Sequence, residues 1–410
     1  MFNISFKDVE TLYLFSFFGS IIATFLGVAF IIPFFLSLMF ILIRYRNKFL
    51  SFNIFRLGRK VYFLHMLCIC WLGFFLFSVV SNLVVNAGEI SGDENLIIIA
   101  AFLYFILGYI GAFTVKYKKV ISYFSLFLIV SFSVVFGFFY CSPLLIKQNY
   151  LHGVFKNINI LTSLVLMLAA ITWPILWSRE SSKISQIFFV LFLGITGCFC
   201  TKSATSEMAV PLFLLLLFIL SFFLESNKID VFFVALLIVC IIATILFKQS
   251  ISESLEKINF MGWEFWREFL NHRDEVWSFS TWMVAKSPLW GIGTGNFSEA
   301  YKVLLSEKGL NGVLQHYNHA HMVFWHQAVI HGLPAFFAYI GALFFIFRGI
   351  FAALKKEKSH YLGISVLGMW LCFCLYGLVE YAVSFRELVP FMWGNTGLLF
   401  GLFVKIQQDK

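Results

Sequence analysis

The chain has 410 residues, of which 60% are hydrophobic, 20% are aromatic and only 12% are charged. This composition excludes an ordinary soluble globular protein, in which about a quarter of the residues are charged, and it indicates a polytopic membrane protein. The net charge of +9 is explained by the Lys and Arg residues of a few short loops and does not predict nucleic-acid binding.

Apolar runs long enough to cross a bilayer, which takes about 20 residues, recur along the whole chain. The first run, 12–43, is too long for one span, and Pro33 with Gly27 offers a turn, so two short helices are predicted there. The beginning of the chain lacks a basic segment, so we expect a first span there and no cleaved signal peptide. Ten further spans are predicted, at 61–85, 97–115, 120–140, 159–177, 184–200, 207–224, 230–247, 322–347, 361–379 and 389–406.

This pattern predicts one all-α integral membrane domain, residues 1–410, with about 12 transmembrane helices. Basic residues in short loops indicate the cytoplasmic side. The loop 44–60 holds six Lys or Arg and no acid, whereas the loop 86–95 holds three acids and no base. Because basic loops recur after every second span, we expect both termini in the cytoplasm. The segments expected on the opposite side are 141–158, 201–206, 248–320 and 380–388.

The longest polar segment, 248–320, carries five of the eleven Trp residues. Since Trp favours the membrane interface, the stretch from Gly262 to Trp282 predicts one or two amphipathic helices on the bilayer. Stacking of the same rings on sugar faces is the alternative. The glycine-spaced stretch 291–295 predicts a tight turn, because a phosphate-binding loop would need a following Lys and Ser or Thr.

A cluster of imidazoles, His319 and His321, lies at the start of span 322–347. Ionisable groups at the mouth of a membrane helix are costly and therefore functional candidates, although a purely structural histidine is the alternative. We expect no metal ion, because no Cys or clustered carboxylate lies near this pair in the sequence. On a continuous helix, positions 321, 332 and 335 lie within about 60° of one another, so Gly332 and Ala335 are expected to allow close helix packing.

Five short segments follow one another in the last two thirds of the chain. They are Gly153-Val154-Phe155-Lys156-Asn157, Thr201-Lys202-Ser203, Arg273-Asp274-Glu275-Val276-Trp277, Lys286-Ser287-Pro288-Leu289-Trp290-Gly291-Ile292-Gly293-Thr294-Gly295-Asn296-Phe297, and His319-Ala320-His321 with Gly332. In this order and with this topology they resemble the O-antigen ligase and O-antigen polymerase superfamily. His321 and Gly332 fit the His-to-Gly spacing of the ligase signature, whereas Met322 and Ala335 differ from its usual residues.

The resemblance implies a glycosyltransferase of type C architecture with one large periplasmic loop, 248–320, in the bacterial inner membrane. It implies transfer of a glycan from undecaprenyl diphosphate to an acceptor hydroxyl on the periplasmic side, with no nucleotide sugar, cofactor or metal. His321 is the expected general base, because imidazole titrates near neutral pH. Arg273 is the expected cation for the diphosphate, because a planar guanidinium binds phosphate in a bidentate way. Further substrate-binding residues are expected at Lys202, Lys156, Asn157, Arg386 and His319.

The spacing from His321 to Gly332 favours an O-antigen ligase, whose acceptor is a lipid A-core sugar. A polysaccharide polymerase, whose acceptor is a second carrier-linked repeat, is the first alternative because of Met322 and Ala335. A transporter of polyprenyl-linked glycans belongs to another functional class. It would need a polar path across both leaflets and matching interrupted halves, whereas the polar residues gather on one side of this chain.

Overall fold

The computed structural model describes residues 13–14, 16–21, 39, 62–86, 92–114, 163–164, 166–168, 170–171, 174, 273–309, 317–356, 359–378, 380–381 and 388–408. Its labelled helices are α3 (Tyr62–Val85), α4 (Gly92–Thr114), α11 (Arg273–Lys286), α12 (Phe297–Glu307), α13 (Val323–Leu354), α14 (His360–Gly377) and α15 (Val389–Gln408). No strand occurs among these residues, which confirms the all-α prediction for the part of the chain that they cover.

Four of these helices, α3, α13, α14 and α15, are long and apolar enough to cross a membrane, and α4 contains a shorter apolar stretch, Ile97–Ala112. The protein is therefore a multi-pass membrane protein. Most ends of these helices lie within a few residues of the ends of the predicted spans. Helix α13 continues beyond the end of its predicted span. Helix α4 begins before its predicted span, because its first residues are polar and were not counted in an apolar run. The predicted spans 120–140, 184–200, 207–224 and 230–247 lie outside the described residues, as do parts of 12–43 and 159–177. The number of about twelve spans and their sidedness stay predictions.

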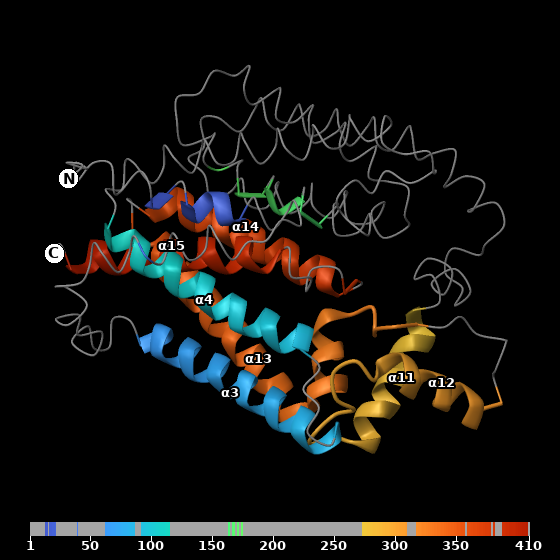
Figure 1. Ribbon diagram of the computed structural model, residues 1–410. Coiled ribbons are helices and arrows are strands. Elements are labelled where there is room, and N and C mark those ends of the chain that lie inside the picture. The colour runs from blue at the N-terminus through green and yellow to red at the C-terminus, as the bar shows by residue number, and fades with distance from the viewer. Residues whose placement is uncertain are drawn as a thin grey trace, which may run out of the picture.

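The described bundle is built on two intimate helix pairs, α4 with α15 and α3 with α13, with α14 against α13 and α15 (Figure 1). The first pair is close because of glycines at its contact. A Cβ atom added to Gly397 would lie 3.0 Å from the backbone nitrogen of Tyr109, and one added to Gly108 would lie 2.8 Å from that of Leu398. Small residues allow the backbones of two helices to come close together. This close packing drives helix association inside a membrane, where the hydrophobic effect does not.

Helix α13 is broken near its start, where Gly332 has φ 83° and ψ 170°. That region of backbone space is open essentially to glycine alone, and Pro334 follows within the same turn. His321 lies before the helix, with φ 48°. The prediction that positions 321, 332 and 335 share one continuous helix face is therefore wrong, because the helix begins after the first position and is interrupted at the second.

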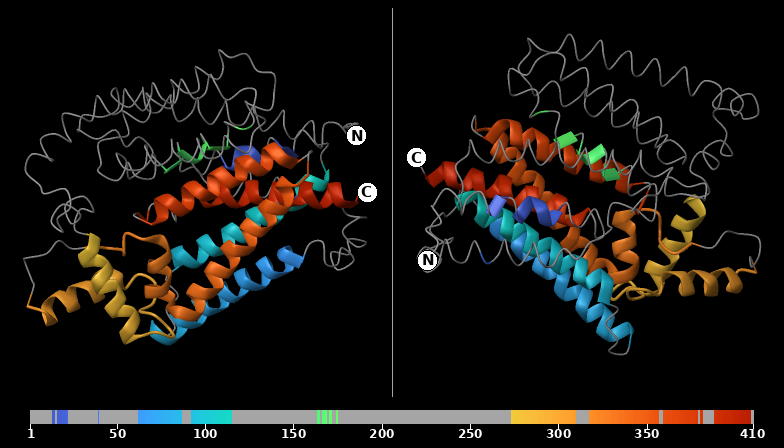
Figure 2. Two further views of the ribbon diagram at one scale, coloured as in Figure 1. Left: turned by 180° about the vertical axis from the view of Figure 1, so that it is seen from behind. Right: turned by 45° about the horizontal axis from the view of Figure 1, so that its top comes forward.

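Helices α11 and α12 lie beside the first part of α13, at the end of the bundle away from the C-terminal end of α15 (Figures 1 and 2). They form a second apolar cluster with that part of α13. Its buried members are Val276, Met283, Val284, Phe297, Tyr301, Leu304, Leu305, Tyr317, Ala320, Ala328 and Val329. The described part of the predicted amphipathic stretch, from Arg273 onward, is helical and packs on protein with its apolar face. Residues 262–272 lie outside the described residues.

The glycine-spaced segment 288–296 forms the predicted tight turn, and it fills the break in α13. The N–H groups of Ile292 and Gly293 donate to the carbonyls of Val329 and Ile330, at 2.9 and 3.0 Å. Leu333, just past the break, donates its own N–H to the carbonyl of Pro288 at 2.8 Å. The turn therefore supplies the partners that the interrupted helix lacks, which buried backbone groups require.

The end of α3 holds this turn from its other side. The Asn82 side-chain oxygen accepts hydrogen bonds from the backbone N–H and the hydroxyl of Thr294, at 2.9 and 2.8 Å. Asn86 accepts from the Asn296 amide at 2.7 Å, and the Ser81 hydroxyl donates to the carbonyl of Ile330 at 3.2 Å. Three segments far apart in the sequence are in this way fixed to one another at the break in α13.

Candidate functional site

Two of the predicted site residues, Arg273 and His321, meet on a third residue that the sequence did not indicate, Glu380. An Arg273 Nη2 group donates to Glu380 Oε2 at 3.0 Å, and His321 Nδ1 lies 3.3 Å from Glu380 Oε1. The backbone N–H of Tyr381 also donates to Oε1, at 2.9 Å. One carboxylate thus connects the expected base to the expected phosphate-binding cation.

Glu380 is 2% exposed, and Arg273 is 6% exposed. Burial by itself raises the pKa of a carboxyl group, but the contact with His321 and the charge of Arg273 outweigh it and lower the pKa of Glu380 to about 2. Glu380 is therefore ionised at neutral pH. In the sequence it was one acid at the start of the predicted outer segment 380–388, and no spacing linked it to a histidine about sixty residues earlier.

Arg273 belongs to α11, next to Asp274 and Glu275. Its guanidinium points away from its own helix to a residue between α14 and α15, and this tertiary contact with Glu380 holds it in place.

The His321 ring is held between two other rings. Tyr317 meets it edge to face, with ring centroids 5.3 Å apart, and the His319 ring lies 4.1 Å away on a tilted plane. The side chain keeps 20% of its surface exposed. A left-handed backbone conformation is uncommon for a residue other than glycine and is often retained at functional sites. His321 is thus fixed in orientation but accessible to a substrate.

His319 has a different character from its neighbour. Its Nδ1 accepts the backbone N–H of His321 at 3.3 Å, and burial, followed by the charge of nearby His321, lowers the pKa of His319 to about 3. His319 is therefore neutral at physiological pH, with its proton on Nε2. It can donate one hydrogen bond to a substrate while it orients the loop that carries His321.

The ligand atoms of His319, His321 and Glu380 lie within 4.8 Å of one another, so these three residues could hold a metal ion. The argument against a metal from the sequence, that no carboxylate lies nearby, is wrong for the folded chain, because Glu380 joins the two histidines. Arg273, however, lies 3.0 Å from the same carboxylate. This guanidinium would repel a divalent cation. Glu380 is therefore better explained as the partner of His321 and Arg273 than as a metal ligand.

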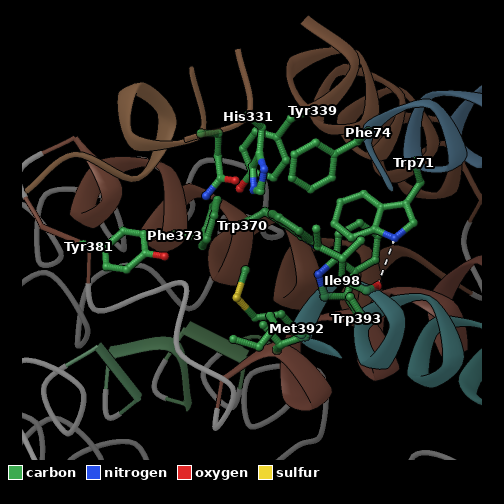
Figure 3. A pocket seen from close by; sticks show the side chains of 14 residues that line it. Trp71, Phe74, Ile98, His331, Tyr339, Trp370, Phe373, Tyr381, Met392 and Trp393 are labelled. Atoms are coloured by element: carbon green, nitrogen blue, oxygen red, sulfur yellow. Dashed lines mark hydrogen bonds between the residues drawn. The ribbon is translucent and has the colours of Figure 1, made fainter. Parts of the chain in front are cut away.

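An aromatic cavity of about 590 Å³, including its mouth, opens among α3, α4, α13, α14 and α15. Figure 3 shows its lining; the aromatic part comprises Trp71, Phe74, Tyr339, Trp370, Phe373 and Trp393. Its polar lining includes Gln327, His331 and Tyr381. The Tyr381 ring also contacts His319 and His326, with centroids 5.1 and 4.3 Å away. Tyr381 therefore lies between the cavity and the histidine cluster.

Two further histidines, His326 and His331, are buried in the first part of α13, and each meets a polar partner. His331 Nδ1 lies 3.0 Å from the hydroxyl of Ser78 on α3, and His326 Nδ1 accepts the backbone N–H of Ala320 at 3.4 Å. The second bond ties the loop that holds His321 to the helix that follows it. Both residues therefore support the site.

The remaining predicted substrate-binding residues, Lys156, Asn157, Lys202 and Arg386, lie outside the described residues. Lys286, which belongs to the segment that carries the resemblance, lies away from the site. It is exposed, pairs with Glu307 at 3.1 Å and covers the ring of Trp282.

A family model described as O-antigen ligase matches residues 188–340. The matched part contains Arg273, His319, His321 and the turn at 288–296, whereas Glu380 lies beyond it. This match confirms the resemblance to the O-antigen ligase superfamily, and it does not distinguish a ligase from a polymerase. A search of curated proteins gives no match.

Proposed function

We propose that this protein is an O-antigen ligase, which transfers a glycan from undecaprenyl diphosphate to a sugar hydroxyl of lipid A-core. The match to the O-antigen ligase family supports glycosyl transfer in lipopolysaccharide or polysaccharide synthesis. The observation that carries the proposal further is the meeting of His321 and Arg273 on Glu380. A base and a cation fixed at one place are what a transfer from a diphosphate carrier requires.

His321 accepts the proton of the acceptor hydroxyl as the oxygen attacks the anomeric carbon of the donor glycan. The bond from that carbon to the phosphate oxygen breaks, and its electron pair leaves with the undecaprenyl diphosphate. Arg273 stabilises the charge that develops on the departing diphosphate. A guanidinium presents its N–H donors as a planar fork, and this geometry matches two oxygens of a phosphate group.

The aromatic cavity offers a site for the first isoprene units of the carrier. Its wall is apolar over most of its area, and one of its polar residues, Tyr381, contacts His319. A lipid diphosphate placed there would keep its hydrocarbon among Trp and Phe rings and its phosphates near Arg273. Lys156, Asn157, Lys202 and Arg386 remain the expected further contacts of the glycan and diphosphate, on the periplasmic side of the bacterial inner membrane.

Replacement of His321 tests the mechanism. The variant His321→Ala should lose glycan transfer in a purified assay, with thermal stability close to that of the wild type, because the side chain is partly exposed. His360→Ala is the matched control: this imidazole lies between α13 and α14 and bonds to the carbonyl of Leu354, away from the site, so activity should persist. Activity should also survive EDTA. Normal transfer by His321→Ala would refute the mechanism.

The acceptor is tested by the lipopolysaccharide of a deletion strain on a gel. Loss of a ligase leaves bare lipid A-core while polymer remains on the carrier, whereas loss of a polymerase leaves core that bears one repeat. The bare-core pattern is expected. A single-repeat band would make the protein a polymerase, with the same donor and the same base.

A further inference from the structure

We propose that Glu380 is the positioning residue of this site, which orients His321 as the base and fixes it relative to Arg273. The inference rests on the proposed function, since it assigns a role within the same transfer reaction. It is carried by the geometry: the two oxygens of one buried carboxylate face the two residues that the reaction needs.

Glu380 is held rigidly by both its backbone and its side chain. Its backbone N–H donates to the carbonyl of Tyr376, which extends the end of α14. Its Oε1 accepts the N–H of Tyr381 at 2.9 Å, and its Oε2 accepts from Arg273 at 3.0 Å. A carboxylate with these partners is confined to one orientation, so it can impose an orientation on the imidazole beside it.

The His321 contact determines which ring nitrogen can act. Since Glu380 accepts hydrogen bonds only, the nitrogen that faces it, Nδ1, carries the proton in the neutral ring, and Nε2 on the far side keeps its lone pair for the acceptor hydroxyl. The two atoms are 3.3 Å apart, within reach of a hydrogen bond, but their angles do not fit one, and Nδ1 has no other hydrogen-bond partner among the described residues. A small rotation of the ring would align this pair, and catalytic hydrogen bonds commonly become aligned only when substrate binds.

Glutamine at position 380 would reverse this arrangement at nearly constant shape. Arg273 is charged and offers only donors, so the Gln carbonyl would turn to Arg273 and the Gln NH₂ group to His321 Nδ1, and the hydrogen bond from the Tyr381 N–H would be lost. That nitrogen would then have to accept, and the ring proton would move to Nε2, where it blocks the base. A role limited to neutralising Arg273 predicts instead that donor binding and stability are affected, with the base intact.

The experiment compares Glu380→Gln, Glu380→Asp and the control Glu307→Gln in the purified full-length protein. Glu307 also pairs with a cation, but at an exposed place, with Lys286. Glu380→Gln should lower kcat by about 10²- to 10⁴-fold, with the KM for undecaprenyl diphosphate-linked donor within about threefold of the wild type. Glu380→Asp, which keeps the charge, should recover part of kcat, and Glu307→Gln should behave as the wild type.

The double variant His321→Ala with Glu380→Gln distinguishes a positioning role from a structural one, and the measured quantity is its residual transfer rate relative to that of His321→Ala. If Glu380 acts through His321, its replacement should change nothing further once the imidazole is absent. Wild-type kcat in Glu380→Gln, while His321→Ala is inactive, would overturn this inference and leave the proposed function intact; an active His321→Ala would refute the proposed function itself. If Glu380→Gln does not fold, Glu380→Asp decides, because wild-type kcat in that variant also overturns the inference.

Discussion

The break in α13 should be intolerant of any side chain at Gly332. A Cβ atom there would lie 2.5 Å from the carbonyl carbon of Leu289 and 2.9 Å from the backbone nitrogen of Trp290. Backbone atoms cannot rotate away, so Gly332→Ala must displace the turn at 288–296. The backbone conformation costs about 1–3 kcal/mol for Ala. Three hydrogen bonds between the turn and α13 are also lost, at about 1 kcal/mol each, so the free energy of unfolding should fall by about 4–6 kcal/mol.

Gly309→Ala provides the matched control. Gly309 also has positive φ, at 67°, but no atom of the described residues lies within 4 Å of its Cβ position. Backbone strain alone should cost about 1 kcal/mol there. The measurement is the free energy of unfolding in mixed micelles of SDS and a mild detergent, together with glycan transfer. Gly332→Ala should be far less stable than the control and should lose transfer, because the turn joins α11, which carries Arg273, to α13.

Equal stability of the two alanine variants would refute this reasoning. It would mean that the turn does not lie against the break, or that its hydrogen bonds contribute nothing. Retained transfer in a destabilised Gly332→Ala would limit the turn to a structural role, since the site would then tolerate its displacement.

Three further outcomes are expected. The lowered pKa of Glu380 stabilises the fold above the ordinary carboxyl value of 4.5, and this contribution, about 3 kcal/mol, is lost as pH falls toward about 2. The free energy of unfolding of the wild type should therefore fall in that window relative to Glu380→Gln, and parallel pH curves would contradict this. Ala101→Leu, in the wall of the cavity, should raise the donor KM severalfold at unchanged kcat; an unchanged KM would place the carrier elsewhere. In a cysteine-free background, an impermeant thiol reagent on spheroplasts should modify Lys308→Cys and spare Lys355→Cys, both exposed positions. Labelling of Lys355→Cys but not of Lys308→Cys would show that the orientation in the membrane is the opposite of the predicted one.

The sequence predicted the helices well, because a long apolar run in a membrane protein has few structures open to it. The ends of α3, α14 and α15 agree with the predicted spans within one or two residues. The break at Gly332 was not predicted, since hydropathy is the same for a continuous helix and an interrupted one. A Gly followed by Pro334 two residues later was the available signal, and it was interpreted as close helix packing.

The site was predicted in part. His321 and Arg273 were chosen because the resemblance and their chemistry agreed, and the structure brings them to one carboxylate. Glu380 was missed because its partners come from other elements, so the sequence holds no spacing that reveals it. The carboxylate that joins His319 and His321 was overlooked for the same reason: proximity along the chain was used in place of proximity in space.

The position of the break in α13 also defines a depth in the membrane. The part after Gly332, residues 333–354, has a helical length of about 33 Å, close to the roughly 30 Å thickness of the hydrocarbon layer. The part before it, 323–331, is about 14 Å long, begins just after His321 and runs in a different direction (Figure 1). If the longer part fills the hydrocarbon layer and the shorter part follows its edge, His321 and Arg273 lie among the lipid head groups. A diphosphate anchored by a polyprenyl tail is confined to that same level, so the carrier would meet the site by diffusion in two dimensions.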